Sequence, residues 1–292
     1  MPASLPLISF FDRVAKSFLQ NRWGRLIAGT ITRMGYHDAG DMAASIAYYT
    51  FLSVFPLLLG VIAFLGLFLP SEVVQQELFA FFNRVFIPVD IIRENISSVI
   101  ELRSALGILS LLGLFWAGSA IFGAIGRVVN RAWDIHQYHP FYIRKPRDLF
   151  LAIATSLLFF ISVALTIVLD FLPIAGLPHG HILLIVASRT LVFPFILTMF
   201  LLIYKYMPNT KILWRDVWGG SLLAAILFTL VHSVSSLYFT QYANYVVIYG
   251  SIASVIVLLV WIYLSAFILI LGAEFNSEYI KIKYGNVERI KY

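Results

Sequence analysis

Residues 41–69 read DMAASIAYYTFLSVFPLLLGVIAFLGLFL, a stretch that begins with a carboxylate and then carries no charge. A run of about 20 apolar residues is long enough to cross the hydrocarbon core of a bilayer as a helix. One face of this helix carries three polar residues and a proline at helical spacing: Ser45, Tyr49, Ser53 and Pro56. Polar side chains on such a face find no hydrogen-bond partners among lipid tails. It predicts a membrane-spanning helix whose polar side faces protein, water or a substrate.

The composition of the whole chain also indicates a membrane protein. Of its 292 residues, 60% are hydrophobic and 12% are charged, with a mean hydropathy of +0.88. Soluble domains carry roughly a quarter charged residues. The chain has no cysteine, which excludes disulfides, thiolate metal ligands and a cysteine nucleophile. The first residues lack a basic segment ahead of their apolar run, so we expect no cleavable signal peptide.

Hydropathy predicts an all-α, polytopic fold with six transmembrane helices in one domain, residues 41–276. The predicted spans lie at about 42–69, 104–126, 149–169, 182–204, 217–239 and 248–273. Residues 1–40 mix apolar and basic groups at helical spacing, which predicts an amphipathic segment on the membrane surface or one packed under the bundle. We expect a periplasmic helical excursion at 71–103 and a cytoplasmic tail at 277–292.

The basic residues predict the orientation of the chain. Of 21 Lys and Arg residues, 17 lie in four segments, 1–41, 127–148, 205–216 and 274–292, whereas three lie in residues 70–103. Cytoplasmic loops carry the excess of basic residues, so both termini are predicted to be cytoplasmic. This topology accounts for the net charge of +6 without a nucleic-acid partner.

Four phrases of the sequence resemble the YihY/virulence factor BrkB family. They are DMAASIAYYTFLSVFPLLL from Asp41, GAIGRVVNRAWD from Gly123, IYKYMPNTKILWRDVWGGSLLAA from Ile203, and VIYGSIASVIVLLVWIYLSAFILILGAEFN from Val247. The resemblance implies six helices in the bacterial inner membrane. The labels of this family range from serum resistance to lipid or solute export, with an old ribonuclease label tied to transfer-RNA processing. The resemblance therefore says more about fold and location than about activity.

One basic residue lies inside a predicted span. Arg189 is about two helical turns into the fourth span, and Pro194 follows it. An ionisable residue at that depth is usually paired or faces water, and Asp170, at the end of the preceding span, is the expected partner. The alternative is that the Arg189 side chain extends to the outer headgroups.

Other charged candidates lie where predicted spans end in the cytoplasm. These residues are Asp41, Arg127, Arg131 and Glu274. They predict a gate or a proton-linked network between the first, second and last spans. Alternatively they are ordinary helix-end charges, with Asp41 favoured by the dipole of its own helix.

Polar residues also occur inside the last two spans. They are His232, Ser254, Trp261 and Ser265. If they converge with the polar face of residues 41–69, they line a cavity at the centre of the bundle. Hydrogen bonding between packed helices is the alternative, because it uses the same residue types.

Asp134, His136 and His139 invite a metal-site or nuclease interpretation. Metal-dependent hydrolysis needs converging acids and histidines with an open coordination position, and this set lacks a second carboxylate cluster. We therefore expect no metal, no cofactor and no enzyme activity, and a ribonuclease is disfavoured.

The leading hypothesis is a transporter-like protein that handles a lipid or another amphiphilic, anionic substrate, with membrane lipids as partners. The alternative is a membrane scaffold that associates with itself or with envelope proteins.

Overall fold

The computed structural model describes residues 20–65, 103–135, 140–171, 180–241 and 251–285. These residues form helices and their connections, with no strand among them, which confirms the all-α prediction. The helices are α2 (Arg22–Tyr36), α3 (Ala39–Leu65), α6 (Arg103–Ala132), α7 (Phe141–Phe171), α8 (Gly180–Tyr206), α9 (Trp214–Gln241) and α11 (Ser251–Tyr284). The predicted excursion at 71–103, apart from Arg103, and the end of the tail, residues 286–292, lie outside the described residues.

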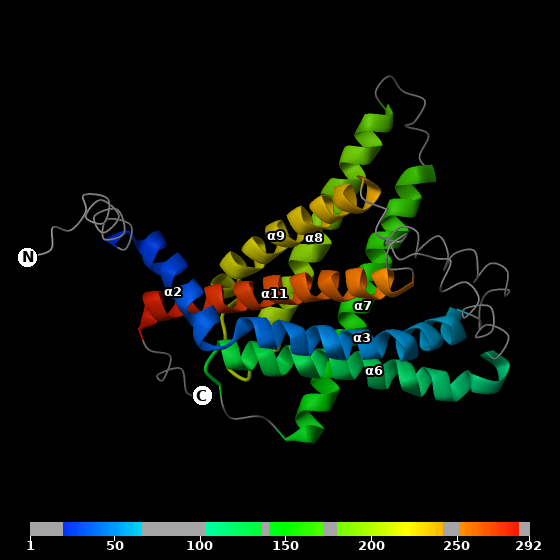
Figure 1. Cartoon of the computed structure of the whole chain (residues 1–292), viewed down its shortest axis with the longest axis horizontal. Coiled ribbons are helices and arrows are strands. Elements are labelled where there is room, and N and C mark those ends of the chain that lie inside the picture. The colour runs from blue at the N-terminus through cyan, green and yellow to red at the C-terminus, as the bar shows by residue number, and fades with distance from the viewer. Residues whose placement is uncertain (1–19, 66–102, 136–139, 172–179, 242–250, 286–292) are drawn as a thin grey trace, which may run out of the picture.

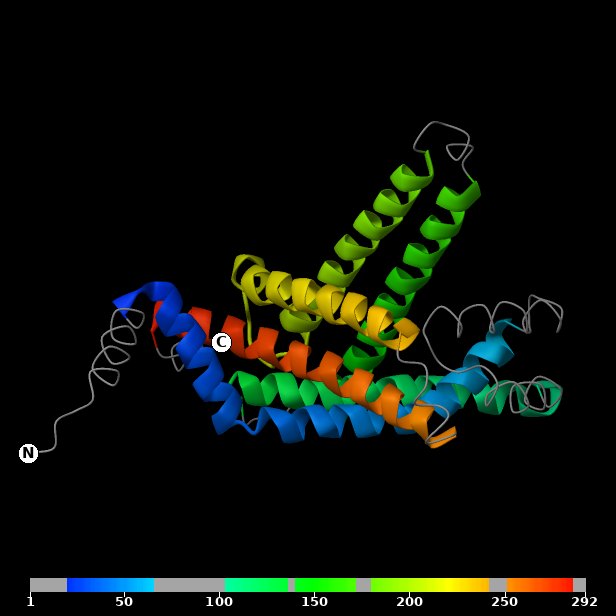
Figure 2. The ribbon, with the colours of Figure 1, turned by 45° about the horizontal axis from the view of Figure 1, so that its top comes forward.

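Three long helices, α3, α6 and α11, run beside one another, and α9 packs on α11 (Figure 1). Helices α7 and α8 contact each other and lean away from α3 and α6 as a pair (Figure 2). The short helix α2 crosses the C-terminal part of α11. We call this side of the molecule, where α2 lies and where α3 begins and α6 ends, the α2 end.

Two helices contain segments long and apolar enough to cross a membrane, Trp214–Val234 in α9 and Val255–Tyr284 in α11. A shorter apolar segment, Val192–Tyr206, lies in α8. Large apolar side chains are exposed at every fourth position of α9, namely Trp218, Leu222, Ile226, Leu230 and Val234. A continuous apolar face that is turned outward is typical of contact with lipid or with another protein. The predicted number of six spans stays a prediction.

Pro56 lies inside α3, which the structure describes as one helix. A proline removes a backbone N–H and crowds the preceding turn, so it favours a bend. Helix α3 changes direction in its second half, the half that contains Pro56 (Figure 2). The surroundings of the Pro56 side chain lie outside the described side chains.

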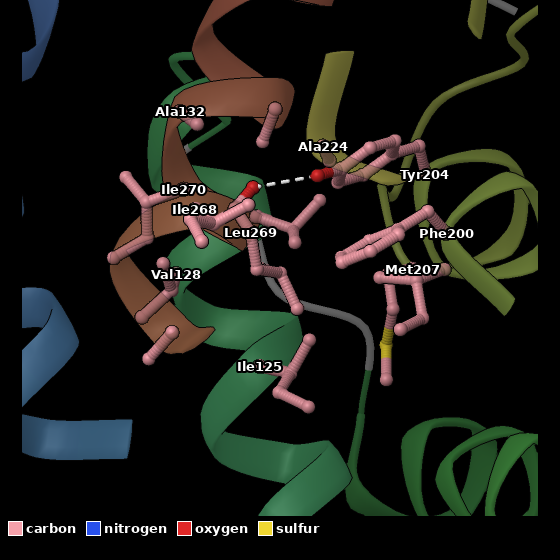
Figure 3. Packing of buried hydrophobic residues seen from close by; sticks show 14 of the residues in the cluster. Ile125, Val128, Ala132, Phe200, Tyr204, Met207, Ala224, Ile268, Leu269 and Ile270 are labelled. Carbon is pink, nitrogen blue, oxygen red and sulfur yellow. Dashed lines mark hydrogen bonds between the residues drawn. The ribbon is translucent and has the colours of Figure 1, made fainter. Parts of the chain in front are cut away.

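The core takes buried residues from all seven described helices, and Figure 3 shows the part formed by α6, α8, α9 and α11. Phe200, Tyr204 and Met207 come from α8 and the residue that follows it, and they face Leu269 of α11 and Ile125 of α6 (Figure 3). The Tyr204 hydroxyl donates a hydrogen bond of 2.8 Å to the backbone oxygen of Leu269. This bond satisfies the polar end of an otherwise buried aromatic side chain.

Helices α9 and α11 approach closely at two glycines. A Cβ atom placed on Gly272 would lie 2.8 Å from the backbone oxygen of Gly220 and 3.0 Å from the Cβ of Ala224. Asn276, one turn further along α11, accepts a hydrogen bond from the Gly220 N–H at 2.7 Å and donates one to the Val217 oxygen at 3.2 Å. Small residues let helix backbones meet, and the amide then fixes their register.

This contact predicts that Gly272→Ala lowers the thermal stability of the purified protein. The added methyl group overpacks the α9–α11 contact, which costs about 1–3 kcal/mol of unfolding free energy. Thermal unfolding in detergent measures the loss. Gly35→Ala is the matched control, because a Cβ there meets nothing within 4 Å. Equal unfolding temperatures for the two variants would contradict the proposed tightness of the contact.

Candidate functional site: charged and polar residues at the α2 end

A fully buried carboxylate lies at the centre of the α2 end. Glu274 of α11 has no exposed surface. One oxygen, Oε2, accepts a hydrogen bond from Arg33 Nε at 3.0 Å, and the other, Oε1, lies 2.6 Å from His37 Nδ1. A buried ionised carboxylate is tolerated only when charged or hydrogen-bonding groups compensate it. Glu274 therefore ties α11 to α2 and to the turn that follows α2.

A second carboxylate, Asp134, joins the same residues from the end of α6. Its Oδ2 lies 3.0 Å from Arg33 Nη1 and 2.8 Å from Lys281 Nζ, and its Oδ1 lies 3.1 Å from His37 Nε2. Partial burial raises the pKa of Asp134, but the hydrogen bond from Lys281 and the charge and hydrogen bond of Arg33 outweigh it. The net effect lowers this pKa from 3.8 to about 2.

We call Arg33, His37, Asp134, Glu274 and Lys281 the ion cluster. Arg33 makes most of its connections, because its Nη2 also donates to the Ala132 backbone oxygen at 2.6 Å and to Ser277 Oγ at 3.1 Å. Ala132 is the last residue of α6, so Arg33 satisfies a carbonyl that the helix itself leaves unpaired.

The spacing within α2 explains how the cluster forms. Gly29, Arg33 and His37 follow one another at intervals of four residues and so lie on one side of the helix. Gly29 lets α2 approach α11, because a Cβ there would lie 2.7 Å from Glu278 Cδ. Asp38, with φ of 54°, turns the chain between α2 and α3. Aspartate is among the few non-glycine residues that tolerate this conformation.

An exposed polar surface lies between α3 and α6. The guanidinium carbon of Arg127 lies 5.2 Å from the centre of the Tyr49 ring, a cation–π contact, and both side chains are exposed. Ser45, one turn earlier in α3, is also exposed. Arg131 Nη2 lies 3.4 Å from Asp38 Oδ2. We call Ser45, Tyr49 and Arg127 the α3–α6 seam; Arg131 lies beside it and pairs with Asp38 instead.

The charged residues predicted from the sequence have separate partners in the structure, and the gate or proton-linked network stays a prediction. Glu274 pairs with Arg33 and His37 rather than with Arg127 or Arg131. The reason is that α2 folds back along α11 and fills the space beside Glu274. Asp41 is exposed in the first turn of α3, as the alternative of a helix-end charge expects.

The predicted cavity residues are distributed over several environments. Ser53 is buried and His232 is exposed on α9. Trp261 packs edge-on against Phe228 with ring centres 6.1 Å apart, and Ser265 Oγ donates to the Trp261 backbone oxygen at 2.8 Å. The convergence of these residues on one cavity stays a prediction. The structure places four further candidates on helices but does not describe their side chains: Pro56, Asp170, Arg189 and Ser254.

Arg33 and His37 were not predicted as site residues. Both belong to the segment expected to be amphipathic, where basic residues have an explanation from topology alone. The only local signal is their four-residue spacing after Gly29. Asp134 was considered as a metal ligand, but the structure uses it as an ion-pair partner. Among the described residues, no group of three His, Asp or Glu side chains forms a metal site. His136 and His139 lie outside these residues.

The ion cluster predicts that Arg33→Ala destabilises the protein strongly. Removing one partner of a buried ion pair leaves an uncompensated charge and costs about 3–5 kcal/mol of unfolding free energy. Thermal unfolding in detergent measures it. Arg131→Ala is the control, because its exposed pair with Asp38 contributes about 0–1 kcal/mol. Similar losses in the two variants would show that burial of Glu274 does not set the energy of the cluster.

The lowered pKa of Asp134 predicts how its contribution depends on pH. A carboxyl whose pKa is lower in the folded state stabilises the protein above its unfolded pKa, 3.8, and this contribution disappears as pH falls to about 2. Unfolding temperatures of the natural protein and of Asp134→Asn should differ at pH 5 and converge between pH 4 and pH 2. A difference that persists unchanged at pH 2 would contradict this assignment.

Comparison with known proteins identifies the family. The family model described as virulence factor BrkB matches residues 30–289. The chain is 30% identical to YfkH of Bacillus subtilis, whose name calls it ribonuclease-like, over 84% of this chain and 92% of YfkH. It is 28% identical to a UPF0761 membrane protein of Aeromonas salmonicida over 89% and 90% of the two chains. It is 27% identical to the UPF0761 membrane protein PSHAa0171 of Pseudoalteromonas translucida over 92% and 90%.

No solved structure matches the chain. The family match covers every described helix except the first part of α2, and it includes the ion cluster and the α3–α6 seam. Together with the outward apolar face of α9, these matches indicate that the chain is a membrane protein. The chain therefore belongs to the virulence factor BrkB family.

Proposed function

We propose that this chain is a transporter-like protein of the bacterial inner membrane that handles a lipid or another amphiphilic anion. In this proposal the α2 end and both termini face the cytoplasm. The observation that carries the proposal is the α3–α6 seam, where an exposed guanidinium lies over an exposed aromatic ring. The ion cluster holds the helices around this seam together.

The chemistry of the seam suits an anionic headgroup. Arg33, Arg131, Arg147 and Arg215 each have a carboxylate within 4.0 Å, whereas Arg127 contacts the Tyr49 ring instead. A guanidinium that stacks on a ring keeps its N–H groups available at its edge. Those groups match two oxygens of a phosphate or a carboxylate.

The surroundings of the seam suit an apolar chain attached to that headgroup. The residues Tyr48 and Leu52 are 59% and 50% exposed. Leu52 lies about one helical turn after Tyr48 and Tyr49 along α3. A basic group with apolar surface on the side toward the bilayer interior favours an amphiphile over a small soluble anion. The natural ligand class for this site is an anionic phospholipid or a molecule of the same design.

The second candidate function is a membrane scaffold. It is favoured by the closed packing at the α2 end, where Phe200, Tyr204 and the Gly220–Gly272 contact fill the space between helices. The outward apolar face of α9 suits a partner helix as well as lipid. A scaffold needs no headgroup site, so the two functions differ in what Arg127 does.

We propose no enzyme activity for this chain. The ion cluster uses its acids and its histidine in pairing, which leaves them poorly placed to activate water. The ribonuclease-like name belongs to YfkH.

The test compares Arg127→Gln and Tyr49→Ala with the natural protein in proteoliposomes. One measurement follows the movement of a fluorescent phosphatidylglycerol between the leaflets. The other compares how much phosphatidylglycerol and phosphatidylcholine the purified protein retains. We expect each variant to lose several-fold in both, because a stacked cation contributes about 0.5–2 kcal/mol.

Arg131→Gln is the matched control, because this exposed arginine of the same helix already pairs with Asp38. It should retain lipid preference and movement. A natural protein that moves no lipid and retains both lipids equally would overturn the proposal and favour the scaffold.

A further inference from the structure

We infer that His37 is held as an imidazolium cation, so that the ion cluster is a proton-binding site that locks α2 to α6 and α11. The inference rests on which atoms face the two ring nitrogens. It does not require the proposed lipid site to be correct, because it concerns residues that the seam does not use.

Both ring nitrogens of His37 face carboxylate oxygens. Nδ1 lies 2.6 Å from Glu274 Oε1 and Nε2 lies 3.1 Å from Asp134 Oδ1. A neutral imidazole has one N–H and one lone pair, and an ionised carboxylate only accepts. In the neutral ring one nitrogen lone pair would therefore face an anionic oxygen at hydrogen-bond distance. Two N–H donors remove this conflict.

The other contacts of the two carboxylates favour their ionised forms. Glu274 Oε2 receives the Arg33 Nε donor, and Asp134 Oδ2 receives donors from Arg33 and Lys281. Hydrogen bonds from cations stabilise a carboxylate and oppose its protonation. The additional proton that the geometry requires is thus best placed on the ring of His37 rather than on either acid.

Among the described residues, a protonated His37 balances the charges that pair within the ion cluster. The cations that pair with these acids are Arg33 and Lys281, and the anions are Asp134, Glu274 and Glu278, the last 4.0 Å from Arg33. Lys283 of α11 pairs with Asp216 instead. An imidazolium makes three charges of each sign. Two nearby groups, Asp38 and Arg131, pair with each other, and Asp41 of α3 is exposed.

This proton has a structural consequence. Helix α2 is joined to α6 and α11 through Arg33 and His37, and Glu274 has no access to water as an alternative partner. Loss of the proton leaves the set with one unbalanced negative charge beside a buried carboxylate, which is costly in a poorly solvated site. We therefore expect deprotonation of His37 to release α2 from the bundle.

The experiment is nuclear magnetic resonance of the full chain in lipid bilayers, with ¹⁵N in histidine side chains. The chain has six histidines. His37 is identified through its bond to Asp38, because this His–Asp pair occurs once in the sequence. At pH 8, where an ordinary histidine is mainly neutral, we expect both His37 nitrogens to carry protons. A neutral His37 at pH 8, with one unprotonated nitrogen, would overturn the inference.

Two conservative variants separate the specific contact from general charge. Asp134→Asn removes one facing carboxylate and should abolish the doubly protonated signal at pH 8. Asp38→Asn removes the exposed acid adjacent in sequence and should leave the signal unchanged. Equal loss in both variants would show that overall negative charge, not the two-sided contact, holds the proton.

A spin label reports on the lock itself. Because the chain has no cysteine, Thr32→Cys places a single label on the exposed side of α2. As pH rises far enough to remove the doubly protonated signal, the label should become more mobile over the same pH range. A label that stays equally immobile after the signal is lost would overturn the locking role.

Discussion

The structure of the α2 end depends on one buried carboxylate and on what surrounds it. Glu274 lies where water does not reach, so its charge must be compensated by protein groups. Arg33 and His37 provide this compensation and bring α2 against α11 in doing so. Arg33 then reaches Ala132 and Asp134, which brings in the end of α6. One charge thereby fixes the relative positions of three helices that are distant in sequence.

The place of that charge follows from packing two residues earlier in α11. At Gly272 the α9 backbone is so close that no side chain fits, and Asn276 hydrogen-bonds the same α9 turn. These contacts set the depth and rotation of α11, and Glu274 lies between them. The close contact of two helices with small residues and the pairing of a buried charge are therefore not separate features. The contact between α9 and α11 determines where the Glu274 side chain lies, and Arg33 and His37 must compensate the charge of that side chain.

Local sequence patterns predicted the helices but not the pairing of their charges. Apolar runs of about 20 residues are typical of long helices whatever surrounds them, so α3, α6, α7, α8, α9 and α11 were expected. Arg33 and Glu274 are 241 positions apart, and nothing near either residue specifies the other. Topology alone explained the basic residues of α2, which hid the role of Arg33. The spacing of Gly29, Arg33 and His37 becomes informative only when α2 is known to turn at Asp38 and lie along α11.

The last two turns of α6 connect the ion cluster with the α3–α6 seam. Arg127 contacts Tyr49, and Arg131, one turn later, pairs with Asp38. The backbone oxygen of Ala132 accepts a hydrogen bond from Arg33. Neighbouring positions of one rigid helix therefore serve both sites. A helix transmits displacement along its length because its backbone hydrogen bonds resist local change. A shift of the α6 backbone that moves Arg127 relative to Tyr49 therefore also strains the contact of Arg33 with Ala132. Conversely, release of α2 would remove the restraint on the end of α6 and leave Arg127 free to shift against α3.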